Sequence, residues 1–200
     1  AGPSGPRRAQ IVGTGLIGGS VGLALRSLGW HVTGRDASDA AAERARELGA
    51  VDALGSDPDA ELVVLAVPVG AVADAAVRAL ADHPRAVVSD VGSVKAPIVA
   101  AVDDPRFVGG HPMAGSEQEG VEGSDAAMFS GAVWVLTPTG DTDPEAYALV
   151  HGLAGAFGAD VVSLAPEGHD ETVAVIRPVP HMTAASFMPL ATARSDEHAT

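Results

Sequence analysis

The chain has 200 residues, a net charge of −14 at pH 7 and no cysteine. The missing cysteines exclude disulfides and thiolate metal sites. The negative charge argues against binding to nucleic acid, whose phosphates need basic partners. No apolar run approaches the roughly 18 residues of a membrane span, and no signal-peptide pattern opens the sequence. We therefore expect a cytoplasmic protein that does not enter a membrane, with residues 1–8 as a disordered leader.

Short apolar runs alternate with segments of helical periodicity over residues 9–165. The runs typical of strands are 9–13, 30–34, 62–67, 86–89, 106–110, 132–137 and 160–164. Helical spacing covers 16–28, the stretch from a cap at Ser38 to a stop at Gly49, and then 69–81, 94–102 and 144–157. Strands separated by helices predict right-handed crossovers in a mostly parallel sheet. Residues 9–165 are therefore expected to form an α/β domain of the Rossmann type.

From residue 166 the pattern changes to helical segments that are interrupted by Pro178, Pro180 and Pro189. No run in this part has the composition of a buried strand. We interpret residues 166–200 as the start of an all-α second domain.

The first strand and the first helix are joined by the loop Gly13-Thr14-Gly15-Leu16-Ile17-Gly18. This spacing, placed between a strand and a helix, is typical of a dinucleotide-binding loop. Gly13 permits the tight turn, and Gly15 lets the backbone approach a pyrophosphate at the positive end of the helix. Gly18 lets the helix pack closely. We expect Gly13, Gly15, Leu16, Ile17 and Gly18 to bind a nicotinamide dinucleotide.

The second strand leads into Asp36, eighteen positions beyond Gly18. A carboxylate there binds the adenosine ribose hydroxyls and repels a 2′-phosphate, which favours NAD over NADP. The neighbouring Arg35 could instead accept that phosphate, so NADP stays open as the less favoured cofactor. Asp36 could also simply cap the next helix.

Two polar segments follow later strands, at the edge of an α/β sheet where ligands collect. One runs from Ser89 to Lys95, and the other contains His111 between Gly110 and Pro112. A neutral imidazole held on such a turn can accept the hydroxyl proton of an alcohol that loses hydride to a nicotinamide. The alternative is a surface histidine in a turn with no role.

The run Gly110-His111-Pro112-Met113-Ala114-Gly115-Ser116-Glu117 resembles the signature of the prephenate dehydrogenases, the TyrA-type enzymes of tyrosine biosynthesis. The glycine loop through Ser20, the segment 90–95 and the segment 169–174 also resemble motifs of that family, in the same order. The resemblance covers the chain from residue 9 onward. It implies NAD-dependent oxidative decarboxylation of prephenate, a dicarboxylate, to 4-hydroxyphenylpyruvate.

The resemblance also implies roles for single residues. His111 would be the base at the ring hydroxyl, Ser93 would assist at the same hydroxyl, and Glu117 would line the pocket and affect substrate access. His181 would lie near the substrate. The His169-Asp170 pair is interpreted as the start of a helix.

The sequence departs from the family pattern at Arg177 and Pro178, where members of the family carry serine and histidine. Arg177 could pair with a substrate carboxylate or face solvent, and Pro178 should break the helix. The change leaves arogenate and 4-amino-4-deoxyprephenate open as substrates. Family members also continue into a helical domain that forms a homodimer and supplies a substrate-binding arginine. No matching arginine is present here, which keeps a silent nucleotide-binding module as an alternative.

A hydroxyacid or imine dehydrogenase would share the cofactor fold, but the motif around His111 argues against it. The other histidines outside the motifs occur singly, at His31, His83, His151 and His198. We expect them on the solvated surface, and we expect no bound metal.

Overall fold

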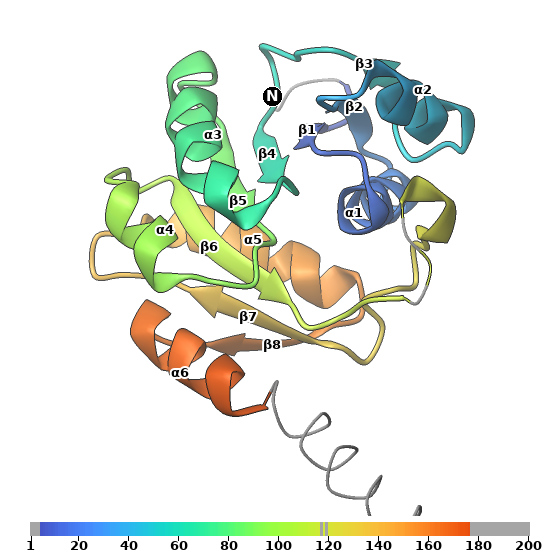
Figure 1. Ribbon diagram of the computed structural model, residues 1–200. Helices are drawn as coiled ribbons and strands as arrows, with labels where there is room; N and C mark the ends of the chain where they lie inside the picture. Colours follow the sequence, from blue (N-terminus) through green and yellow to red (C-terminus); the bar gives the residue numbers. More distant parts are fainter. Residues whose placement is uncertain (1–4, 117, 119, 177–200) are drawn as a thin grey trace, which may run out of the picture.

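The computed structural model describes residues 5–116, 118 and 120–176, which build one eight-stranded sheet with helices on both faces (Figure 1). The strands are β1 (Arg8–Val12), β2 (His31–Arg35), β3 (Ala53–Leu54), β4 (Leu62–Leu65), β5 (Val87–Asp90), β6 (Phe107–Pro112), β7 (Val133–Thr137) and β8 (Asp160–Ser163). The helices are α1 (Leu16–Ser27), α2 (Asp39–Glu47), α3 (Val69–Asp82), α4 (Ala96–Ala101), α5 (Pro144–Ala156) and α6 (Pro166–Ile176), with a 3-10 turn, η1 (Val121–Gly123).

The strands lie in the order β3-β2-β1-β4-β5-β6-β7-β8. All neighbours are parallel except β6 and β7. Between these two strands the described residues form the short turn η1 and no crossover helix. The chain returns to the edge of the sheet at which it left, so β7 runs in the opposite direction. The predicted Rossmann-type, mostly parallel sheet is therefore confirmed.

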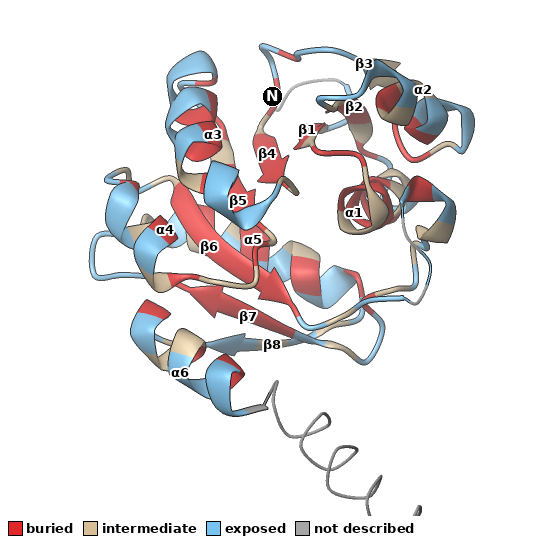
Figure 2. Cartoon of the chain, viewed as in Figure 1, coloured by how far each residue is buried: buried red, intermediate tan, exposed pale blue. Residues whose placement is uncertain are grey.

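Two hydrophobic cores fill the two faces of the sheet. Alternate residues of β4 divide between them, because Leu62 and Val64 pack towards α1 and α5 while Val63 and Leu65 pack towards α3 and α4. A strand that is buried on both faces must be apolar throughout, which is why the run over β4 shows no alternation. Figure 2 shows this buried centre, with β8 exposed at the edge.

Helix α6, the first helix of the segment expected to begin a second domain, packs against α4 and β7. Its His169 is fully buried and Val173 is nearly so. The division of the chain at residue 165 stays a prediction, but this helix is continuous with the sheet domain. Among the described helices, none is long and apolar enough to cross a membrane.

Two local expectations are wrong, and one strand was not predicted. The disordered leader was expected to include Arg8, but this residue begins β1 because its backbone pairs with His31. His83 is buried rather than solvated, since its ring turns back so that Nδ1 lies 3.0 Å from the carbonyl oxygen of Ala79. The strand β3 was missed because two residues are too few to show a period.

Of the other single histidines, His31 is half-buried, His151 is exposed, and His198 lies outside the described residues.

The single lysine of the sequence, Lys95, is completely buried with Asp90 as its ion-pair partner. Its Nζ also donates to the carbonyl oxygen of Gly110, at 2.8 Å. Asp90 in turn accepts from the amides of Gly92 (2.8 Å) and Gly110 (3.1 Å). Burial disfavours both charges, so it raises the pKa of Asp90 and lowers the pKa of Lys95. The attraction between the two groups shifts both pKa values the other way but does not outweigh burial. The pair therefore ties the end of β5 to β6, next to His111.

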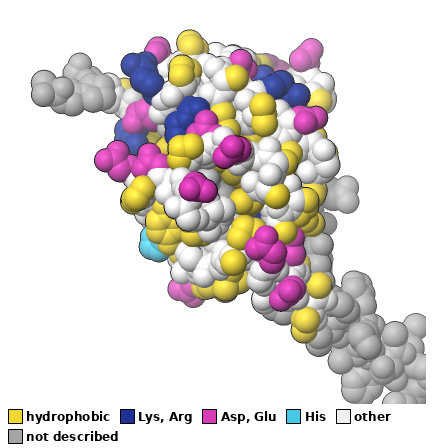
Figure 3. Space-filling model, turned by 90° about the vertical axis from the view of Figure 1, so that its left-hand side faces the viewer, with side chains coloured by type: hydrophobic (Ala, Val, Ile, Leu, Met, Phe, Trp, Pro, Cys, Tyr) yellow, Lys and Arg dark blue, Asp and Glu magenta, His cyan; other side chains and the backbone are white. Residues whose placement is uncertain are grey.

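Acidic side chains are spread over the whole of the face in Figure 3, whereas the Lys and Arg side chains stay in its upper half. This face therefore carries no continuous basic track of the kind that follows a nucleic acid backbone.

We expect Lys95→Met to lower the free energy of unfolding by about 3–5 kcal/mol at neutral pH, because it leaves a buried carboxylate unpaired. The deficit relative to wild type should shrink as the pH falls, since protonation of Asp90 removes the buried charge. Denaturant titrations at several pH values measure this. The double variant Lys95→Met/Asp90→Asn is the control and should be more stable than the single one. Wild-type stability of Lys95→Met at neutral pH would contradict the role of the pair.

We also expect Gly22→Ala in α1 to destabilise the fold by about 1–3 kcal/mol, as overpacking does. A Cβ at Gly22 would lie 2.2 Å from the carbonyl oxygen of Ala50. The matched control is Gly152→Ala in α5, where a Cβ meets nothing within 4 Å. That change should stabilise by about 0.5–1 kcal/mol through the lower entropy of the unfolded chain. Thermal unfolding of both variants should therefore give shifts of opposite sign.

Candidate active site

The glycine loop connects β1 to α1 at the edge of the sheet where the parallel strands end. Gly13 has φ of 92°, and a Cβ there would lie 2.3 Å from the carbonyl oxygen of Ala66. At Gly18 a Cβ would lie 1.9 Å from the carbonyl oxygen of Gly13, so the loop cannot close around a larger residue. Both positions are therefore restricted to glycine by the backbone itself.

Gly15 differs from these two glycines because a Cβ there would meet no atom of the described chain within 4 Å. It is the N-cap residue of α1 and supplies no capping side chain. The amides of the first turn are thus left to a ligand, and the positive end of the helix dipole favours an anion. The geometry suits a phosphate group above Gly15.

Asp36 follows β2 and binds the glycine loop. Its Oδ2 accepts from the amide of Thr14 at 2.8 Å, and its Oδ1 accepts from the amide of Ser38 at 3.0 Å. The residue that caps α2 is Ser38, whose side chain accepts from the amide of Ala41. The alternative of Asp36 as the helix cap is therefore wrong. Asp36 lines a cavity with Gly13, Arg35 and Arg78, together with residues at the end of β1, just after β4 and in α3.

A second cavity lies on the other side of the loop. It is lined by Gly15, Leu16, Ile17, Gly18, Ala66, Val67, Pro68, Val69, Val91, Gly92, Ser93, His111, Pro112 and Ala114. The structure thus brings together the loop, Ser93 and His111, which lie far apart in the sequence. Ser93 is half-buried, and His111 is 8% exposed at the end of β6. A flat ring in this cavity would lie between the loop and both polar side chains.

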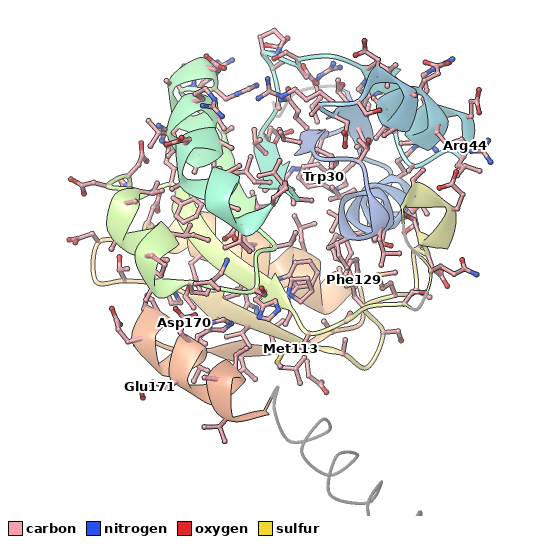
Figure 4. The ribbon with its side chains drawn as sticks, viewed as in Figure 1. Trp30, Arg44, Met113, Phe129, Asp170 and Glu171 are labelled. Atoms are coloured by element: carbon pink, nitrogen blue, oxygen red, sulfur yellow. The ribbon has the colours of Figure 1, made fainter. Side chains whose placement is uncertain are left out.

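His111 is supported by a residue that the sequence analysis did not assign to the site. Nδ1 of His111 lies 2.9 Å from Nε2 of the fully buried His169, on α6. Nδ1 of His169 lies 2.7 Å from Oδ1 of Asp170. Figure 4 shows Asp170 on the side of α6 towards α4, while Glu171 points away. The signal in the sequence was the His-Asp pair itself, interpreted only as a helix start.

The carboxylate of Asp170 also holds the first residues of α4. It accepts from the amide of Lys95 at 2.8 Å and from the amide of Ala96 at 2.9 Å. The largest influence on the pKa of Asp170 is burial, which raises it. The bonds from Ala96, His169 and Lys95 outweigh burial, so this pKa lies below its ordinary value. Asp170 is therefore a carboxylate at neutral pH.

Three predicted substrate residues, Glu117, Arg177 and His181, lie outside the described residues. Within the described part of the chain, no three His, Cys, Asp or Glu side chains gather where they could hold a metal ion.

The comparisons with known proteins agree with this arrangement. The family model for the nucleotide-binding domain of prephenate dehydrogenase matches residues 21–163. A prephenate dehydrogenase of Bacillus subtilis is 34% identical over 193 residues, which are 89% of this chain and 52% of the relative. The chain thus spans about half the length of that curated relative.

Two solved structures have a similar fold. The prephenate dehydrogenase of A. aeolicus in complex with hydroxyphenyl propionate and NAD+ has a TM-score of 0.83 at 31% identity, covering 94% of this chain and 70% of that one. The arogenate dehydrogenase of Synechocystis has a TM-score of 0.81 at 32% identity, with coverages of 92% and 68%. The chain belongs to the prephenate dehydrogenase family, and it contains that family's nucleotide-binding domain.

Proposed function

We propose that the protein is an NAD-dependent dehydrogenase that converts prephenate to 4-hydroxyphenylpyruvate by oxidative decarboxylation. The observation that carries the proposal is that the glycine loop, Ser93 and His111 line one and the same cavity. It offers an anion site at the start of α1 and a proton acceptor within one hollow. The names of the B. subtilis and A. aeolicus relatives support the same reaction.

The two cavities divide the proposed cofactor between them. The pyrophosphate would lie on the amides that follow Gly15, and the adenosine ribose would lie beside Asp36. The A. aeolicus structure, in complex with NAD+, supports this cofactor. Arg35 and Arg78 line the same cavity as Asp36, whose carboxylate would repel a 2′-phosphate bound there. NAD is therefore favoured over NADP.

The chain's own residues would handle the proton of the reaction. NAD, when bound, supplies the hydride acceptor. His111 takes the proton of the ring hydroxyl as the carbon that bears it loses hydride, and Ser93 holds the same hydroxyl in place. The ring carboxylate leaves as carbon dioxide, and its bonding electrons complete the aromatic ring. The phenolate oxygen then takes back the proton held by His111, which gives 4-hydroxyphenylpyruvate.

The remaining substrate contacts rest on the family resemblance. Glu117 would line the entrance, His181 would lie near the ring, and Arg177 would pair with a substrate carboxylate. Arogenate is a second candidate substrate, which the similarity to the Synechocystis arogenate dehydrogenase supports. The homodimer and the cytoplasmic location stay predictions from the sequence.

The first test measures NADH formation with prephenate, arogenate and 4-amino-4-deoxyprephenate side by side, and we expect the highest kcat/KM with prephenate.

In the same assay, we expect His111→Asn to lower kcat by about 10²- to 10⁴-fold with the affinity for NAD intact, because it removes only the base. His151→Asn, at an exposed position on α5, is the matched control and should match wild type. Unchanged turnover in His111→Asn would rule out this residue as the base.

The second test concerns cofactor choice. We expect Asp36→Ala to narrow the ratio of kcat/KM for NAD over NADP by about tenfold or more, because a charge-assisted hydrogen bond to the ribose is lost. Asp39→Ala, at an exposed acid in the first turn of α2, should leave the ratio unchanged. An unaltered ratio in Asp36→Ala would count against the ribose contact.

A further inference from the structure

We propose that His169 and Asp170 act as positioning residues that fix the tautomer of His111, so that its Nε2 is the nitrogen that accepts the substrate proton. This inference deepens the proposed function and rests on it for the identity of the base. The geometry of the hydrogen bonds carries it.

The chain of hydrogen bonds starts at the carboxylate of Asp170, which is an acceptor. A carboxylate only accepts hydrogen bonds, and this one already accepts from the amides of Lys95 and Ala96. Because Nδ1 of His169 lies 2.7 Å from Oδ1 of the same carboxylate, Nδ1 must carry a hydrogen. In a neutral imidazole the other nitrogen then holds the lone pair. Nε2 of His169 is thus an acceptor.

The same argument passes on to His111. Its Nδ1 lies 2.9 Å from Nε2 of His169, and two lone pairs cannot face each other at that distance. Nδ1 of His111 therefore carries a hydrogen and donates it, which leaves the lone pair on Nε2. The two rings meet edge to face, with centroids 5.1 Å apart and an angle of 72°, so a ring N–H can point at the neighbouring nitrogen.

The hydrogen-bonded chain Asp170–His169–His111, called the relay below, also stabilises the charge that forms during the reaction. When Nε2 of His111 takes the substrate proton, the ring becomes positive while its Nδ1–H stays bonded to His169. The negative Asp170 lies at the other end of the relay, and burial of His169 keeps water from screening the attraction. Only one proton moves, from the substrate hydroxyl to His111.

One alternative would reverse the arrangement. If His169 were protonated on both nitrogens, its Nε2–H would donate to His111, and His111 would carry its hydrogen on Nε2. The charged groups near this pair in the described structure are Asp170, on α6, and the Asp90–Lys95 ion pair between β5 and β6. That state would make His111 a donor towards the substrate, so the two arrangements are distinguishable by experiment.

The first experiment is a nitrogen-15 NMR spectrum of the chain labelled at histidine, at neutral pH, with His111 assigned from the spectrum of His111→Asn. We expect His111 to be protonated on Nδ1 and unprotonated on Nε2. A spectrum with His111 protonated on Nε2 would overturn the proposal. This measurement needs no turnover, so it decides the relay even if the proposed reaction is wrong.

The second experiment compares two substitutions at His169 in the dehydrogenase assay. We expect His169→Leu to lower kcat by about 10- to 100-fold, because Nδ1 of His111 loses its buried acceptor. His169→Gln offers an amide oxygen to the same N–H and should keep kcat within about threefold of wild type. NADH binding, followed by fluorescence, should be unchanged in both variants. An equal loss of kcat in the two variants would contradict the positioning role.

Two controls separate the relay from a structural effect. Glu171→Gln removes the neighbouring exposed acid on α6 and should leave kcat unchanged, whereas Asp170→Asn should lower it. In the His111→Asn background, His169→Leu should add almost nothing, because the group it positions is gone. Additive losses in that double variant would show that His169 acts elsewhere and would overturn the proposal.

Discussion

The site depends on the buried contact between Lys95 and Asp90. A lysine with no exposed area is costly unless its charge is met, and here one carboxylate and the carbonyl of Gly110 meet it. These contacts reach from the end of β5 to the residue before His111. Because β5 and β6 are neighbours, a shift of either strand would move Ser93 and His111 apart. The ion pair thus holds the two segments that line the cavity at a fixed spacing.

A second polar network lies beside the first, and the two share Lys95. The side chain of Lys95 belongs to the ion pair, while its amide donates to Asp170. Asp170 therefore faces both the beginning of α4 and, through His169, the imidazole of His111. Buried polar groups of this kind are stable only when each one is paired. Their pairing holds α6, α4 and β6 together around His111.

Local patterns in the sequence were sufficient for much of this structure. The apolar runs marked seven of the eight strands, and the glycine spacing marked a loop whose backbone excludes any other residue at Gly13 and Gly18. The reversal of β7 could not be predicted, because strand direction depends on how a connection returns to the sheet. His83 was expected at the surface since it stands alone in the sequence, but its ring packs on the last turn of α3.

The support for His111 could not be predicted from spacing either, because its partner lies 58 positions away. A periodic pattern tells which face of a helix is buried, yet it does not tell which side chain that face meets. The contact also joins the two parts into which the sequence was divided at residue 165. A chain ending there would keep the glycine loop, Ser93 and His111, but it would lack the acceptor for Nδ1 of His111. His111 and the residues that form this hydrogen-bond chain with it thus lie on opposite sides of the expected domain boundary, so the proposed site draws on both parts of the chain.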